Sequence, residues 1–272
     1  MDDKKKSLCQ LFHQGSSKLV LLFHGLGGKT DSAYLMRTAR TVLSYGYDVA
    51  CLSLPGNQDR SPYLYHAGDS DFFDAVLAHF RPSYKTTHWV GFSFSGNLIL
   101  QWLKTPKEIT TAVVVSPVTD LQKSVQRIDA PSQWIYRKYF LRKLIQLFQD
   151  KYRQHPDIFQ AWKNVCQAST IETFDQLFTC PFHGYATPAD YYHANSSVFH
   201  LSSIQTPVSI IYALDDPFIS PEDFTPKAIT SNPFLKIMAT KYGGHVGFFR
   251  SLSEGFQYPY WIMQEITVHA EK

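Results

Sequence analysis

The segment GFSFSGN (residues 91–97) constrains the fold of this chain more than any other part of its sequence. It follows the run TTHWV (residues 86–90), which is typical of a buried strand, and it leads into LILQWL (residues 98–103), which is typical of a helix. A strand that turns directly into a helix needs small residues and presents the residue at the turn beyond the edge of the sheet. Ser93 takes that place, so its hydroxyl is a candidate nucleophile.

The turn departs from the usual G-x-S-x-G pattern, because Ser95 stands where the second glycine is expected. Serine is still small and Gly96 follows it, so a tight turn remains feasible. If Ser95 were the nucleophile, Ser93 and Asn97 would occupy the two glycine positions, which fits the pattern less well. An ordinary strand–helix turn with serine at the helix N-cap is the structural alternative.

A glycine-rich turn, HGLGG (residues 24–28), follows the apolar run KLVLLF (residues 18–23). Backbone N–H groups in such a turn can face a ligand, because few side chains cover them. We expect the N–H groups of Leu26 and of Phe94, the residue after Ser93, to form an oxyanion hole. A phosphate-binding loop is the alternative, but neither G-x-x-x-x-G-K-[ST] nor G-x-G-x-x-G can be read here.

Two later segments place an acid and a histidine after apolar runs. VSIIYA (residues 208–213) leads to LDDPFI (residues 214–219), and FLKIMA (residues 234–239) precedes GGHVGF (residues 243–248). Each segment has an ordinary interpretation, since Asp and Pro favour turns and the chain has 11 histidines. Their order and their places at strand ends nevertheless favour an acid, Asp216 or Asp215, and a base, His245, for Ser93.

These four segments together resemble the YheT-like α/β-hydrolases, a bacterial group related to eukaryotic α/β-hydrolase-domain lipid esterases. The resemblance runs from about residue 18 to the C-terminus, and ADYY (residues 189–192) and SS (residues 196–197) resemble the cap region of that group. It implies the order nucleophile, acid, base, and it favours Asp216 over Asp215 because an apolar residue follows Asp216 at the expected spacing. Only about 18 residues precede the strand that leads to His24, so we expect the first strands of the usual sheet to be missing or reduced.

Apolar runs alternate with helical patterns through most of the chain. The expected strands are residues 19–23, 47–52, 86–90, 109–115, 206–213 and 234–239, and the expected helices before residue 109 are 31–45, 69–80 and 98–103. This alternation predicts an α/β fold with a mostly parallel sheet and helices on both faces. We assign residues 1–118 and 204–272 to an α/β-hydrolase core and residues 119–203 to a helical cap insertion.

The segment 119–203 is rich in aromatic residues. The resemblance implies a cap over Ser93, and an apolar cap would exclude water and shape an acyl pocket. Residues 134–153 are amphipathic, with one apolar face (Ile135, Leu141, Leu144, Ile145, Phe148 and Tyr152) and one polar face (Lys138, Arg142, Gln146, Gln149 and Arg153). We favour packing of the apolar face on the core. Contact of this helix with a membrane surface is left open.

Composition narrows the classes of function. A net charge of +3 and a pI near 8.5 do not indicate a nucleic-acid-binding protein. The four cysteines are widely separated, with no zinc spacing, and we expect no metal and no cofactor. The charged start MDDKKK does not fit a signal peptide, and no run of about 18 apolar residues occurs, so we expect a cytoplasmic protein.

The sequence therefore predicts a serine hydrolase that cleaves a carboxylic ester with an apolar acyl group, using Ser93, Asp216 and His245. Its expected partner is a small-molecule ester, and the sequence does not reveal the oligomeric state. Two other functions stay open. An acyltransferase or thioesterase would use the same three residues, and a binding protein would share the fold without catalysis.

Overall fold

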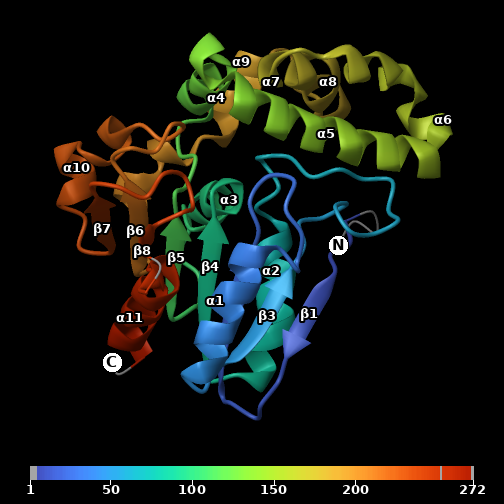
Figure 1. The fold of residues 1–272 in the computed structure, drawn as a ribbon. Coiled ribbons are helices and arrows are strands. Elements are labelled where there is room, and N and C mark those ends of the chain that lie inside the picture. Colours follow the sequence, from blue (N-terminus) through green and yellow to red (C-terminus); the bar gives the residue numbers. More distant parts are fainter. Residues whose placement is uncertain (1–4, 252, 271–272) are drawn as a thin grey trace.

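A computed structural model describes residues 5–251 and 253–270, and a seven-stranded sheet forms its centre (Figure 1). The strand order is β1-β3-β2-β4-β5-β6-β7, with β1 antiparallel to β3 and the other neighbouring pairs parallel. The strands are β1 (Cys9–Phe12), β2 (Lys18–Phe23), β3 (Asp48–Leu52), β4 (Thr86–Phe92), β5 (Thr111–Val115), β6 (Val208–Ala213) and β7 (Leu235–Thr240). A separate pair, β8 (Phe249–Ser251) and β9 (Gly255–Phe256), forms a short hairpin.

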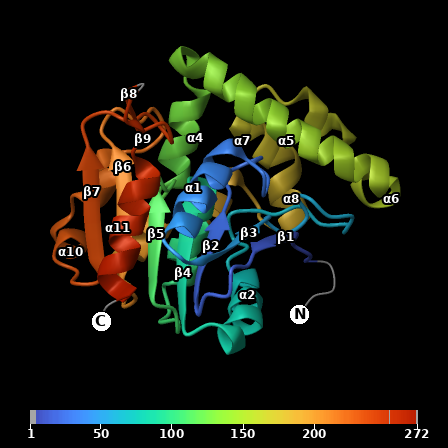
Figure 2. The same ribbon diagram turned by 60° about the horizontal axis from the view of Figure 1, so that its bottom comes forward.

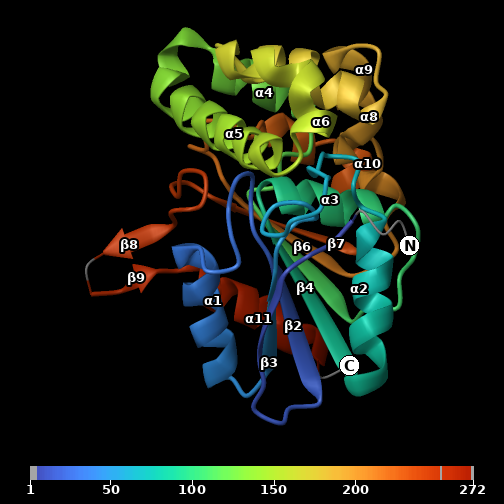
Figure 3. The ribbon, with the colours of Figure 1, turned by 90° about the vertical axis from the view of Figure 1, so that its right-hand side faces the viewer.

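Helices cover both faces of the sheet, as the continuous apolar strands predict (Figure 3). On one face α1 (Ala33–Ser44) and α11 (Tyr258–Ala270) pack on Val20, Leu22 and their neighbours. On the other face α2 (Phe72–Phe80) and α3 (Phe94–Trp102) pack on Leu19, Leu21 and Phe23. Alternate residues of one strand thus enter two separate cores, which confirms the predicted α/β architecture.

A helical segment, residues 121–203, lies beyond the carboxyl ends of the strands (Figures 1 and 2). Its α-helices are α4 (Leu121–Asp129), α5 (Trp134–Gln154), α6 (Pro156–Phe159), α7 (Ile171–Phe174), α8 (Cys180–His183) and α9 (Pro188–Asn195). Residues 175–179 form a π-helical turn between α7 and α8. The remaining helices are α10 (Lys227–Thr230) and the 3₁₀ turns Arg81–Ser83, Pro131–Gln133, Gln160–Gln167, Ser197–Phe199, Leu201–Ser203 and Pro221–Phe224.

Polar contacts tie the helical segment to the loop between β3 and α2 and to α3. The buried Lys151 ammonium on α5 donates to the backbone carbonyls of Asp59 and Ser61, each at 2.8 Å. On the other side, the Asn97 side chain of α3 donates to the Asn195 carbonyl at 2.9 Å and accepts from the Ser197 N–H at 3.0 Å. Because these buried groups need partners, they fix the segment over the sheet.

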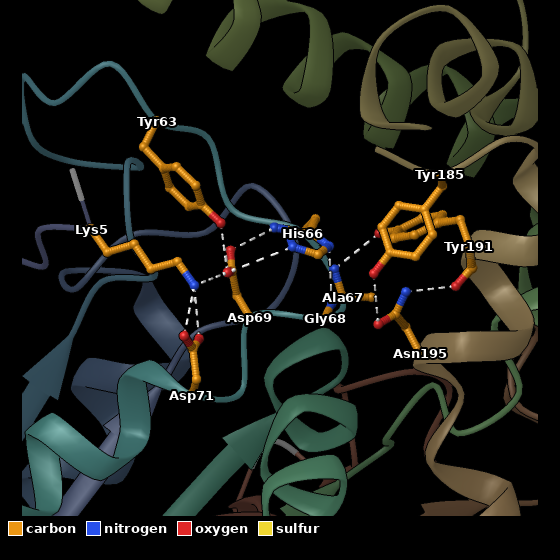
Figure 4. Close-up of polar contacts among 10 residues, drawn as sticks. All are labelled: Lys5, Tyr63, His66, Ala67, Gly68, Asp69, Asp71, Tyr185, Tyr191 and Asn195. Carbon is orange, nitrogen blue, oxygen red and sulfur yellow. Dashed lines mark hydrogen bonds and ion pairs between the residues drawn. The ribbon is translucent and has the colours of Figure 1, made fainter. Parts of the chain in front are cut away.

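A buried network orders the loop between β3 and α2 (Figure 4). The Asp69 carboxylate pairs with Lys5 Nζ at 2.8 Å, and it accepts hydrogen bonds from the Tyr63 hydroxyl at 2.6 Å and from the His66 N–H at 3.1 Å. Next to it, the Ala67 N–H donates to the Tyr191 hydroxyl of α9 at 2.9 Å. The loop therefore connects the N-terminal segment to the helical segment.

The observed elements differ from the predicted ones in a few places. The helix expected at 69–80 begins at Phe72, and the strand expected at 109–115 begins at Thr111. Within the described ranges a single four-residue strand, β1, precedes β2, while residues 1–4 of the charged start lie outside those ranges. Ile135 was expected on the packed face of its helix, and this was wrong, because its side chain is 62% exposed at the first turn of α5. The boundaries 118/119 and 203/204 stay predictions.

Candidate active site

Ser93 occupies a strained turn between β4 and α3. It is the N-cap of α3, and its φ of 53° and ψ of −111° lie in a region that residues other than glycine rarely adopt. The Ser93 N–H donates to the Val115 carbonyl at 2.8 Å, which holds the turn against β5. A Cβ at Gly91 would lie 2.8 Å from both Ile99 Cδ1 and the Ser95 carbonyl oxygen, so the first glycine of the pattern is required by packing.

Ser95 is fully buried behind this turn. Its hydroxyl donates a hydrogen bond to the carbonyl oxygen of His24, the first residue of the HGLGG turn. The residue that breaks the G-x-S-x-G pattern therefore joins the two turns of the site. The structure places Ser93, rather than Ser95, against the cavities described below.

A chain of two hydrogen bonds joins the serine, the histidine and the acid chosen from the sequence. His245 Nε2 lies 2.7 Å from Ser93 Oγ, and His245 Nδ1 lies 2.9 Å from Asp216 Oδ2. Ser93 follows β4, Asp216 follows β6, and His245 follows β7, so the carboxyl ends of three parallel strands bring together residues 152 positions apart.

The two neighbouring acids have different partners. Asp216 is buried, and its Oδ1 accepts from the N–H groups of Phe218 at 2.9 Å and Ile219 at 3.2 Å, which leaves Oδ2 directed at His245. Asp215 Oδ1 accepts from the N–H groups of Gly243 and Gly244, both at 2.9 Å. Asp215 thus holds the loop that carries His245, whereas the sequence offered it as the alternative acid.

The HGLGG turn is held by two tyrosine hydroxyls. The Gly25 N–H donates to Tyr34 and the Gly27 N–H donates to Tyr65, each at 2.8 Å. Between them, the Leu26 N–H has no hydrogen-bond acceptor among the described residues. The Phe94 N–H belongs to the first turn of α3, where N–H groups have no intrahelical acceptor.

Close approach of the two turns depends on Gly25. A Cβ at this position would lie 3.3 Å from Ser93 Cβ and 3.4 Å from the Phe92 carbonyl oxygen. His24 beside it is fully buried, and its Nε2 accepts from the Leu54 N–H at 3.1 Å while Nδ1 faces the Gly25 carbonyl at 2.8 Å. Burial lowers the pKa of His24 to about 4, so the ring is neutral and orients this turn.

Two cavities meet at Ser93. The first lies between the sheet and the helical segment and holds about 840 Å³ of space not filled by protein atoms, part of it open to solvent. Its walls are mostly apolar and include Leu26, Leu144, Phe174, Phe178, Tyr192 and Phe218. The second is more polar and opens beside the HGLGG turn, with Lys29, Ser32, Tyr139 and Lys143 in its walls. Both include Ser93 and His245, so an extended molecule could occupy both cavities at once.

The first cavity contains one carboxyl group that the sequence did not reveal. Asp175 is buried in the π-helical turn and accepts from the Thr179 hydroxyl at 2.6 Å and the Tyr192 hydroxyl at 2.8 Å. Burial raises its pKa from the ordinary value of 3.8 to about 6. Over residues 5–251 and 253–270, no group of three or more His, Cys, Asp or Glu residues could hold a metal ion.

The chain belongs to the α/β hydrolase fold family, whose sequence model matches residues 18–227. It is 29% identical over 240 residues to the esterase-type protein YheT of Escherichia coli (strain K12), covering 84% of this chain and 70% of that protein. It is 27% identical over 262 residues to the human phospholipase ABHD3, covering 92% of this chain. The alignment covers 63% of ABHD3, less than two thirds of its length.

Solved structures with the same fold include an esterase from Pyrococcus furiosus, Pf2001. The TM-score is 0.62 at 17% sequence identity, with 98% of this chain and 89% of the other covered, so this similarity concerns the fold alone. In the part of the chain that the structure describes, no helix is both long enough and apolar enough to cross a membrane.

Proposed function

We propose that this protein hydrolyses carboxylic esters through an acyl-enzyme intermediate on Ser93. The observation that carries the proposal is the hydrogen-bonded chain from Ser93 through His245 to Asp216, set between two cavities. Membership in the α/β hydrolase fold family supports it, as do the names of the relatives, an esterase and a phospholipase.

In the first half of the reaction, Ser93 Oγ attacks the ester carbonyl carbon. His245 Nε2, 2.7 Å away, takes the serine proton as the new C–O bond forms. When the tetrahedral intermediate collapses, the bond to the alcohol oxygen breaks and His245 gives the proton to the departing alcohol. Water then attacks the acyl-enzyme by the same sequence, which releases the carboxylic acid and restores Ser93.

Asp216, the HGLGG turn and the turn at Ser93 support these proton and acyl transfers. The Asp216 carboxylate accepts from His245 Nδ1–H, which leaves Nε2 unprotonated and stabilises the imidazolium that forms. The N–H groups of Leu26 and Phe94 hold the developing oxyanion, and each such donor contributes roughly 3–4 kcal/mol in enzymes of this kind. The strained backbone conformation of Ser93 holds its hydroxyl beside His245 Nε2.

The two cavities bind the two parts of the substrate on either side of the ester group. The apolar cavity under the helical segment takes the acyl chain, because its lining offers dispersion contacts and few polar groups. The more open, polar cavity takes the alcohol part and provides its exit. In this arrangement the segment 119–203 acts as a cap that excludes water from the acyl chain.

Hydrolysis of p-nitrophenyl esters of increasing acyl length tests the function, with covalent labelling by a fluorophosphonate as a second measurement. We expect turnover by the wild type, and Ser93→Ala should abolish both turnover and labelling. The matched control is Ser95→Ala, which loses a buried hydrogen bond to His24 and should keep both signals within about tenfold. If turnover survives in Ser93→Ala and disappears in Ser95→Ala, the nucleophile is Ser95 and the assignment to Ser93 is wrong.

A further inference from the structure

The first turns of α5 expose a stripe of large apolar side chains. Trp134, Ile135 and Tyr139 are 56%, 62% and 54% exposed, respectively. Ile135 and Tyr139 are four residues apart, so they lie on one side of the helix. The side chains of Leu144 and Phe148 are buried on the other side, and α5 lies at the outer side of the helical segment (Figure 2). The rest of the chain therefore leaves more than half of each of these three residues uncovered.

Positive charge accompanies this stripe. Residues 134–149 contain four cationic side chains and no Asp or Glu, the cations being Arg137, Lys138, Arg142 and Lys143. Lys138 and Arg142 are exposed, four residues apart, and neither forms an ion pair with a described carboxylate. We call Trp134, Ile135, Lys138, Tyr139 and Arg142 the α5 stripe. It combines aromatic and aliphatic side chains with uncompensated cations.

The α5 stripe is continuous with the candidate active site. Tyr139, Phe140 and Lys143 line the open cavity beside Ser93. From the same helix, the rings of Tyr136 and Phe140 pack on Phe218, with centroids 5.0 and 5.5 Å apart. Phe218 packs on the His245 ring at 4.8 Å. An apolar path of side chains thus runs from the exposed stripe to the site.

We propose that the α5 stripe docks the protein on the surface of an anionic phospholipid membrane. Trp and Tyr side chains favour the interface between lipid headgroups and acyl chains, because one end of each is apolar and the other polar. Lys and Arg side chains are attracted to anionic headgroups, which supply the negative charge that residues 134–149 lack. Docking through this stripe places the open cavity at the membrane. The proposal concerns binding and does not depend on the ester hydrolysis proposed above.

Flotation with lipid vesicles tests the docking directly. The wild type should bind vesicles of phosphatidylcholine with about 30% phosphatidylglycerol, and it should bind phosphatidylcholine alone at least about tenfold more weakly. Trp134→Ala/Ile135→Ala and Lys138→Glu/Arg142→Glu should each reduce partitioning to the anionic vesicles at least about tenfold. None of these four side chains lines either cavity, so hydrolysis of a water-soluble short-chain ester should not change.

Matched changes elsewhere on the surface provide the controls. Tyr260→Ala removes a similarly exposed aromatic ring from α11, and Arg40→Glu/Lys85→Glu changes the net charge by the same amount at two exposed positions. Both controls should bind anionic vesicles as the wild type does. The proposal is overturned if the wild type fails to float, if the stripe variants float like the wild type, or if the control charge reversal weakens binding as much as Lys138→Glu/Arg142→Glu.

Discussion

The candidate site has two sides: the loops at the carboxyl ends of the parallel strands, called the sheet edge below, and the helical segment. Different forces hold the two sides in place. At the sheet edge, directional hydrogen bonds fix each polar atom: Ser93 Oγ, His245 and Asp216 form one chain, and Ser95 joins the two turns. The helical segment contributes mainly apolar side chains to the cavity wall. Hydrogen bonds specify angles and distances, whereas apolar contacts specify shape and volume. We therefore expect substitutions at the sheet edge to change rate, and substitutions in the helical segment to change substrate preference.

The two regions also bury titratable groups with opposite effects on stability. The pKa of His24, beneath the sheet-edge turns, is lowered to about 4, so the unfolded chain binds the proton more strongly and the free energy of unfolding falls as the pH decreases from about 6.5 to 4. The pKa of Asp175, in the helical segment, is raised to about 6, so the folded protein binds the proton more strongly. Its contribution to the free energy of unfolding falls as the pH increases from about 4 to 6.

The largest expected effect lies at the sheet edge. Asp216→Asn should lower kcat about 10⁴-fold with the fold intact, because an amide N–H facing His245 Nδ1 favours the wrong imidazole tautomer. Asp215→Asn keeps an amide oxygen that can accept from the Gly243 and Gly244 N–H groups, so kcat should stay within about tenfold. Steady-state kinetics on a p-nitrophenyl ester measures both. The reverse order of severity would move the catalytic acid to Asp215.

Asp175→Asn tests the pH behaviour of the helical segment. The substitution removes a buried charge, so it should raise the free energy of unfolding by about 2–3 kcal/mol at pH 7–8. At pH 4 the gain should be only about 0.5 kcal/mol, because the folded carboxyl is protonated and the unfolded one is roughly half ionised. Urea unfolding monitored between pH 4 and 8 gives this difference directly. A variant that is less stable than the wild type at pH 8 would show that the charged form of Asp175 stabilises the fold.

The same contrast explains what could be predicted from the sequence. The central strands are continuous apolar runs, and their carboxyl ends gather the polar residues that follow them. Ser93, His245 and an acid at 215 or 216 could therefore be selected by position, whereas the choice of Asp216 came from the resemblance. β1 was not predicted because its side chains are exposed or half-buried, which leaves no apolar run to recognise. In the helical segment, the burial of Asp175 depends on contacts between separate helices. Periodicity likewise placed Ile135 on the packed apolar face of its helix. This was wrong because periodicity does not reveal where a helix extends beyond its neighbours.

A smaller effect is expected where a side chain only supports the candidate oxyanion hole. Tyr65→Phe leaves the Gly27 N–H without its partner, which loosens the turn that carries Leu26. We expect kcat to fall about tenfold, since one such unsatisfied group corresponds to roughly 1–2 kcal/mol. Tyr63→Phe is the matched control, because it removes a hydroxyl bonded to Asp69 from the same loop and should leave kcat within about twofold. Equal losses in the two variants would indicate general destabilisation of the loop.

The smallest expected effect is a change of acyl preference without a change of chemistry. Leu147 on α5 is half-buried and lines the apolar cavity, so Leu147→Ala should lengthen the space for the acyl chain. We expect the ratio of kcat/KM for a longer ester to that for a shorter one to rise about three- to fivefold, since each buried methylene contributes up to about 0.8 kcal/mol. Ile145 on the same helix is also half-buried but does not line the cavity, and Ile145→Ala should leave the ratio unchanged. If both variants leave acyl preference unchanged while Leu147→Ala lowers kcat for every ester equally, the helical segment supports catalysis as a whole, and the acyl chain does not lie in this cavity.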